Sequence, residues 1–208
     1  NKMITKINIK LFLLSVISFC FLNMTLSQTN KSVTDFLGVP GPLLFNTKSY
    51  ILNWSAHPNA SYYKQEYLVK SDRTDKYNTM LLLDVITGKQ DLKDIVNNKI
   101  AEIKKMKETN PIINYEIIHN PKTDEYMLDF LLTSNAADGS ISILERNVYR
   151  YKSFIDKAGN KSAMLFGVSV RAYGASAANQ FLISLKSNRK DLINKVSQYK
   201  IPSIKITK

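Results

Sequence analysis

Cysteine is almost absent from this chain of 208 residues: the one cysteine, Cys20, lies inside the apolar run Leu11–Leu22. Outside that run no disulfide, thiol nucleophile or cysteine ligand for zinc is available. Histidine is nearly as scarce, and His57 and His119 each stand beside a turn signal. A zinc site would need one or two further ligands. The sequence therefore predicts no metal and no cofactor.

Glycine is also scarce, and none of the seven glycines belongs to a phosphate-binding loop. The nearest approach to a catalytic motif is Gly174-Ala175-Ser176-Ala177-Ala178, which loosely matches the nucleophile elbow of hydrolases. That elbow requires an acid and then a histidine downstream, and no histidine follows His119. We therefore interpret Ser176 as a helix N-cap, and we expect no nucleic-acid binding because no such motif accompanies the basic charge.

The apolar run has the length and the flanking residues of an export signal. Lys6 and Lys10 precede it, and Thr25-Leu26-Ser27 supplies small residues where a signal peptidase cleaves. Its twelve residues are too few to cross a bilayer as a helix, which takes about 20. We expect residues 3–27 to be a signal peptide and residues 28–35 to be a flexible segment. The mature protein is then periplasmic or secreted, without a transmembrane segment.

Positive charge is unevenly placed along the chain, whose formal net charge is +12. Residues 28–139 hold 13 basic and 14 acidic side chains, whereas residues 140–208 hold 13 basic and 3 acidic ones. The excess in the last third is either ordinary solubility charge or a surface that attracts an anionic partner.

The stretch Asp91–Glu108 is a clear amphipathic helix, because its apolar residues recur every three or four positions. Asp91 suits its N-cap, and Asn110-Pro111 ends it. A second helix is expected from Ser176, with an apolar stripe that reaches Tyr199. Strand patterns surround the first helix: 49–56, 61–69, 79–87, 112–119, 126–134, 141–154 and 162–173.

Consecutive hairpins predict a mainly antiparallel central sheet, and each helix must cover part of it. Thr79–Thr87 is apolar on both faces, so the helices should lie on opposite sides, in a layered α/β/α sandwich. Tyr50 and Trp54 of the first hairpin are expected on one face, as part of the core. The sequence thus predicts a single α+β domain over residues 36–208.

The order of these elements, with a hairpin first, a helix between central strands and a closing helix, resembles the PsbP/Mog1-like fold. The strings Asn147-Val148-Tyr149-Arg150-Tyr151-Lys152 and Phe181-Leu182-Ile183-Ser184-Leu185-Lys186, with a terminal Ile201-Pro202, resemble an exported bacterial family of unknown function. The likeness covers roughly residues 36–206. It implies an accessory or binding role without catalysis.

Alternation of side chains along a strand gives the candidate ligand-binding residues. Arg146, Arg150 and Lys152 share one face of their strand, and Arg171 joins them if the next strand pairs back through a short turn. Four neighbouring cations repel one another, so this basic face is expected to meet water or an anionic partner.

The sequence is best interpreted as a secreted or periplasmic binding or accessory protein rather than an enzyme. Its partner would be an anionic glycan, an anionic lipid headgroup or an acidic protein surface. Two other classes stay open: an envelope-associated hydrolase whose site is scattered in sequence, and a structural subunit of an envelope assembly. Converging polar groups in a pocket would favour the hydrolase, and a large exposed apolar patch would favour the subunit.

Overall fold

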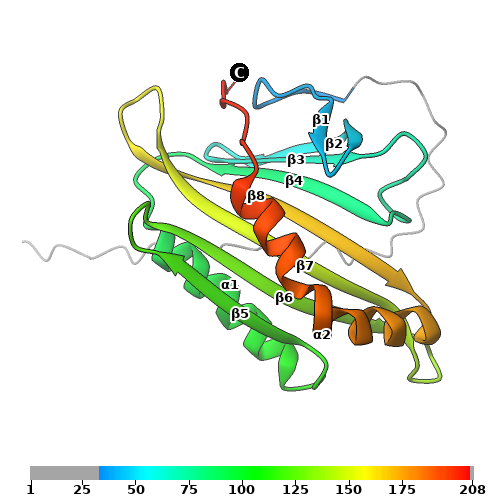
Figure 1. Cartoon of the computed structure of the whole chain (residues 1–208). Helices are drawn as coiled ribbons and strands as arrows, with labels where there is room; N and C mark the ends of the chain where they lie inside the picture. The colour runs from blue at the N-terminus through cyan, green and yellow to red at the C-terminus, as the bar shows by residue number, and fades with distance from the viewer. Residues whose placement is uncertain (1–32, 207–208) are drawn as a thin grey trace, which may run out of the picture. The chain divides into compact units, whose positions relative to one another are not determined.

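Residues 33–206 are described by the computed structural model, and they form an eight-stranded antiparallel sheet with two helices (Figure 1). The predicted α+β class is thus confirmed. The expected signal peptide, residues 3–27, lies outside the described residues. At the described end of the segment expected to be flexible, the Asp35 carboxylate accepts hydrogen bonds from the backbone N–H groups of Leu37 and Val39.

The strands follow one another across the sheet in the order β1-β2-β3-β4-β8-β7-β6-β5. Only the step from β4 to β8 joins strands that are distant in sequence, and the other neighbours are consecutive. The elements are β1 Leu43–Phe45, β2 Lys48–Asn59, β3 Tyr62–Leu68, β4 Thr79–Ile86, α1 Leu92–Lys107, β5 Asn114–Asn120, β6 Glu125–Asn135, β7 Ile141–Ile155, β8 Lys161–Tyr173 and α2 Ala175–Gln198.

Helix α1 forms where the sequence predicts it. The Asp91 carboxylate caps it by accepting the Lys93 N–H at 2.8 Å, and three lysines stand in its last turn. Leu92, Val96 and Ile103 are buried against β5, β6 and β7. A helix of this length is marginal alone in water, so this packing stabilises it.

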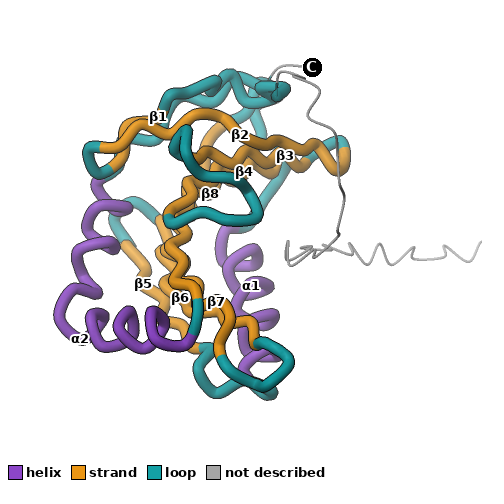
Figure 2. Tube along the Cα trace, turned by 90° about the vertical axis from the view of Figure 1, so that its right-hand side faces the viewer, coloured by secondary structure: helices purple, strands orange, loops and turns teal. Residues whose placement is uncertain are grey.

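Helix α2 packs on the opposite face of the sheet, as the end-on view in Figure 2 shows. Its Val196 belongs to the larger core, together with Leu81 and Leu83 of β4 and Val148 of β7. The start of α2 differs from the prediction: its N-cap is Gly174, at φ 81°, and not Ser176. The positive φ explains the glycine, because a side chain would strain that backbone.

The first hairpin also departs from prediction. A β-bulge lies between Leu52 and Trp54, so Leu52 is opposite Tyr67 and Trp54 is opposite Glu66. The extra residue moves Trp54 to the face away from Tyr50. Tyr50 is 2% exposed in the larger core, whereas Trp54 is 40% exposed. The expectation that both rings share one core face is therefore wrong.

The packing of α1 predicts the effect of a buried charge. Ile103→Asp places an unpaired carboxylate in the apolar layer between α1 and the sheet, and it should destabilise the domain by about 4 kcal/mol or more. Ala101→Asp, on the exposed side of the same helix, should cost less than about 1 kcal/mol. Urea unfolding monitored by circular dichroism measures both variants, and equal losses would contradict the assignment of the buried face.

Candidate functional site

The pairing of β7 with β8 divides the four predicted ligand-binding residues between two faces. Glu145 is opposite Arg171 and Arg146 is opposite Val170. Because residues directly opposite each other in an antiparallel pair share a face, Arg171 points away from the side of Arg146, Arg150 and Lys152. The expectation of one shared basic face is therefore wrong. The connection after β7 sets this register, which begins with Ile155 opposite Lys161.

Arg146 is buried beneath α2, with 3% of its surface exposed. Its Nε and Nη2 donate to the two carboxylate oxygens of Asp129 at 2.9 and 3.1 Å, and Nη2 also donates to the Arg189 carbonyl at 2.7 Å. The Arg189 side chain pairs with Asp129 at 2.8 Å and with Glu116 at 2.9 Å. This network ties α2 to the sheet and pairs the Arg146 charge within the fold.

Arg150 and Lys152 lie further along the same face, where α2 ends. The Arg150 Nε donates to Glu125 at 2.8 Å, and its Nη1 donates to the Tyr199 carbonyl at 3.0 Å. Lys152 Nζ lies 3.4 Å from the other oxygen of Glu125, and 47% of the lysine side chain is exposed. The Glu125 carboxylate thus forms ion pairs with both Arg150 and Lys152. Arg150 holds the end of α2 in place, and Lys152 remains open to solvent.

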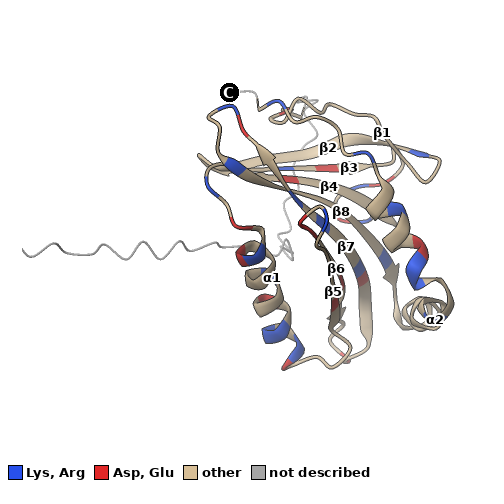
Figure 3. Ribbon diagram, turned by 60° about the vertical axis from the view of Figure 1, so that its left-hand side comes forward, with Lys and Arg blue, Asp and Glu red and all other residues tan. Residues whose placement is uncertain are grey.

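A groove of about 560 Å³ lies over these two cations, between the sheet and the segment that follows α2. Figure 3 shows basic residues recurring along α2. Polar or basic side chains and apolar or aromatic ones line the groove in equal number: Arg150, Lys152, Phe154, Met164, Ser197, Gln198, Tyr199, Lys200, Ile201, Pro202, Ser203 and Ile204.

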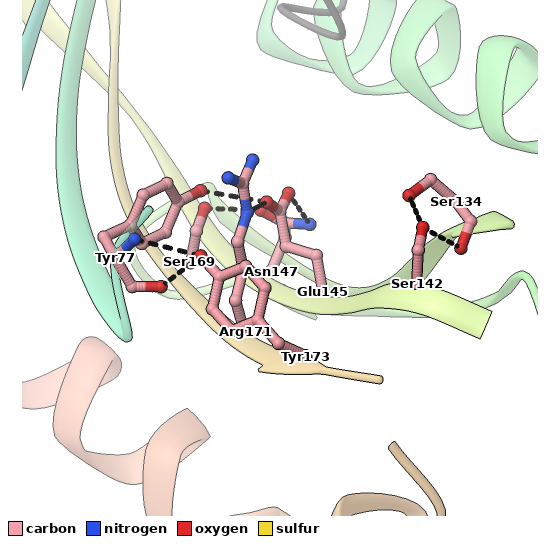
Figure 4. Close-up of polar contacts among 8 residues, drawn as sticks. All are labelled: Tyr77, Ser134, Ser142, Glu145, Asn147, Ser169, Arg171 and Tyr173. Carbon is pink, nitrogen blue, oxygen red and sulfur yellow. Dashed lines mark hydrogen bonds and ion pairs between the residues drawn. The ribbon is translucent and has the colours of Figure 1, made fainter. Parts of the chain in front are cut away.

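Arg171 belongs to a hydrogen-bonded cluster on the α1 face (Figure 4). Its Nε lies 2.6 Å from Glu145, which also accepts the Tyr77 hydroxyl at 2.9 Å, and its guanidinium stacks over the Tyr77 ring. The Tyr173 hydroxyl donates to the Tyr77 carbonyl at 2.7 Å. These contacts anchor the β3–β4 connection on the sheet, so Arg171 has a structural role.

The same face carries two carboxyl groups that the sequence analysis did not select. Glu66 is 5% exposed and makes no hydrogen bond or ion pair with any described residue. Burial raises its pKa to about 7, with Asp84 and Glu145 adding to the effect and Lys64 and Arg171 opposing it. Its oxygens are not fully enclosed, because the enclosed side-chain atoms without a hydrogen-bond partner in residues 33–206 are Asp84 Oδ1 and Ser153 Oγ.

Asp84 is the neighbouring acid on β4. Its Oδ2 accepts the Tyr62 hydroxyl at 2.7 Å and lies 3.8 Å from Lys64 Nζ, whereas its Oδ1 is buried without a partner. Burial raises the pKa of this carboxyl too. Asp84 interrupts the apolar strand TMLLLDVI, and that interruption was the one sequence signal that could have pointed to this place.

The two histidines lie in separate surroundings. The His57 ring stacks on the Tyr63 ring with the two centroids 4.1 Å apart. The His119 ring stacks on the Tyr126 ring with the centroids 4.3 Å apart, and its Nε2 lies 3.3 Å from Asp124 Oδ1. Within residues 33–206, no group of three or more histidine, cysteine, aspartate or glutamate side chains could hold a metal ion. Over the same residues, neither helix is long and apolar enough to cross a membrane.

Comparison with known protein families gives a match over most of the domain. The model of an uncharacterised protein family matches residues 37–201, which covers nearly the whole described domain. No curated protein and no solved structure matches the chain.

The buried ion pair beneath α2 makes a stability prediction. Asp129→Asn leaves the Arg146 charge buried without a carboxylate and should destabilise the domain by about 3–5 kcal/mol. Replacing both partners, Asp129→Leu with Arg146→Met, should cost much less, because no unpaired charge remains. Denaturant unfolding of the three proteins tests this, and a double variant as unstable as Asp129→Asn would contradict it.

Glu66 makes a prediction about pH. Its pKa is raised in the folded state from 4.5 to about 7, so the folded state binds more protons than the unfolded state between these values. Its contribution to stability is therefore full at acid pH and falls as pH rises through that window, by up to about 3 kcal/mol. Glu66→Gln has no carboxyl group to titrate at this position. Its stability relative to the wild type should therefore rise by that amount between pH 4 and pH 8. Parallel unfolding profiles of the two proteins would contradict the prediction.

Proposed function

We propose a binding function without catalysis for this chain, which belongs to the uncharacterised family whose model it matches. The partner that we propose is an anionic glycan, held in the groove at the C-terminal end of α2. The observation that carries the proposal is the exposed Lys152 in that groove, where Arg150 and Lys200 add positive charge.

The charge balance of the groove favours an anion. Arg150, Lys152 and Lys200 line it, and Glu125 is the acid paired with the first two. Because one carboxylate faces two cations, positive charge remains after the ion pairs are counted. Lys152 and Lys200 are exposed, so a ligand can reach them without breaking a buried pair.

The shape and lining favour a glycan among the anionic partners. The cations line a hollow, and a flat bilayer surface cannot enter a hollow as a narrow chain does. Ser197, Gln198 and Ser203 add hydroxyl and amide groups that can hydrogen-bond sugar hydroxyls. The volume of about 560 Å³ lies within the range of sites for small molecules.

The same proposal includes export through the signal peptide expected at residues 3–27, and a PsbP/Mog1-like fold with layered α/β/α architecture. The position of α1 and α2 on opposite faces of an antiparallel sheet supports the layered architecture. Export would place the groove where acidic polysaccharides of the cell envelope can reach it.

Charge reversal tests the groove. Lys152→Glu with Lys200→Glu should weaken binding to heparin fragments by about tenfold or more, because two attractive charges become repulsive. Binding by the unaltered protein should weaken between low and high salt, since exposed charges are screened. Isothermal titration calorimetry at two salt concentrations measures both effects.

The matched control is Lys89→Glu with Lys93→Glu, one exposed lysine in the connection before α1 and one in the first turn of α1. Neither lines the groove, so this variant should bind like the unaltered protein. Equal loss in both double variants would mean a general effect of net charge and would contradict the groove. Binding to anionic vesicles but not to heparin would show a membrane partner instead. No binding to either probe would overturn the proposal.

A further inference from the structure

A second groove lies on the α2 face of the sheet, beside β5 and β6. Helix α2 packs against β7 and β8 and leaves part of this face open. Glu116 and Ile118 of β5 point to this face and are exposed. The groove between α2 and the two strands has a volume of about 290 Å³. It is separate from the groove at the C-terminal end of α2, because no residue lines both.

One side of α2 forms a wall of this groove. Its lining residues follow the i, i+3, i+4, i+7 spacing of a single helix face: Leu182, Leu185, Lys186 and Arg189. Both leucines are half-buried and so keep exposed apolar surface, and Leu131 of β6 adds a third apolar side chain to the lining. The wall therefore changes from apolar to cationic within two turns of the helix.

The charges at the cationic end of the groove do not balance. Asp129 accepts from Arg146 at 2.9 Å and from Arg189 at 2.8 Å, and Arg189 also forms an ion pair with Glu116 at 2.9 Å. Lys186 is exposed and makes no hydrogen bond or ion pair within residues 33–206. Three cations thus meet two carboxylates, and the positive charge left over is that of Lys186.

Lys186 and Arg189 are placed to hold one carboxylate between them. They are three residues apart on α2, and side chains at that spacing are neighbours on a helix surface. Arg189 uses Nε for Asp129 and Nη2 for Glu116, so its Nη1 is left to donate to a ligand. Hydrogen bonds from two cations to a carboxylate are charge-assisted and therefore stronger than neutral ones.

We propose that this second groove binds a small carboxylate with a short apolar chain. Lys186 and Arg189 hold the carboxylate, and Leu182 and Leu185 contact the chain. The ligand class follows from three observations: one cation is left without a partner, an apolar wall adjoins it, and the volume is just below the about 300–1,000 Å³ of sites for drug-sized molecules. The inference does not depend on glycan binding in the other groove.

The experiment uses sodium hexanoate as the probe at pH 7, with acetate and 1-hexanol as comparison ligands. Titration with hexanoate should shift the backbone amide signals of residues 182–189 to saturation in ¹H–¹⁵N NMR spectra. Acetate should bind about tenfold or more weakly, because it has no chain to bury against the leucines. 1-Hexanol should also bind about tenfold or more weakly, because it offers no charge to the two cations.

Two variants separate the cationic end of the groove from its apolar wall. Lys186→Glu should weaken hexanoate binding by about tenfold or more, because an attractive charge becomes repulsive. Lys190→Glu makes the same change in net charge one turn further along α2, at an exposed lysine outside the groove lining, and should bind like the wild type. Leu182→Asn should weaken the binding of hexanoate by about fivefold and leave the affinity for acetate unchanged.

The two grooves can be tested independently. Lys152→Glu with Lys200→Glu alters only the lining of the first groove and should leave hexanoate binding unchanged. Amide signals of residues 182–189 that do not move with hexanoate overturn the proposal, and so does equal affinity in Lys186→Glu and Lys190→Glu. Binding of 1-hexanol as tight as that of hexanoate would show that the groove does not use its charge, and it would overturn the assignment to a carboxylate.

Discussion

The register between β7 and β8 is the constraint on which the arrangement of side chains depends. The Asp156 carboxylate fixes the turn between them by accepting the backbone N–H groups of Ala158 and Asn160 and the Ser162 hydroxyl. A slip of one residue would exchange the two faces of either strand. Arg146 would then meet the α1 core and Tyr149 would meet α2, so the turn decides which charges each helix has to accommodate.

The two faces of the sheet differ in how their buried charged groups are paired. On the α2 face, Arg146 and Asp129 are buried as a complete set, with Arg189 of α2 closing the network. On the α1 face, the cluster around Glu145 is complete, but Asp84 Oδ1 and Ser153 Oγ are enclosed without a hydrogen-bond partner. The two faces thus differ in how completely their buried polar groups are paired.

Sequence periodicity was enough for the class of fold, for α1 with its Asp91 cap, and for the two-sided apolar strand β4. Those features depend on local spacing, which a sequence shows directly. The candidate site could not be predicted in the same way. The face of Arg171 depends on the length of one turn, and the face of Trp54 depends on one inserted residue in β2. Such single-residue changes reverse a side chain without altering the strand pattern. Glu66 lies in a strand of mixed polarity, YYKQEYL, so nothing local distinguishes it from an exposed acid.

The pairing of β4 with β8 requires two strands that are far apart in the chain to meet during folding. The strand pair joins Ile86 to Ala163, and every residue of α1, β5, β6 and β7 lies between them in the chain. Local hairpins can form early on either side, but the sheet becomes continuous only when this long segment closes. The β4 edge and the apolar residues around it therefore stay open until late in folding. A chain that pauses there exposes two strand edges at once, which is the form in which β-rich proteins aggregate.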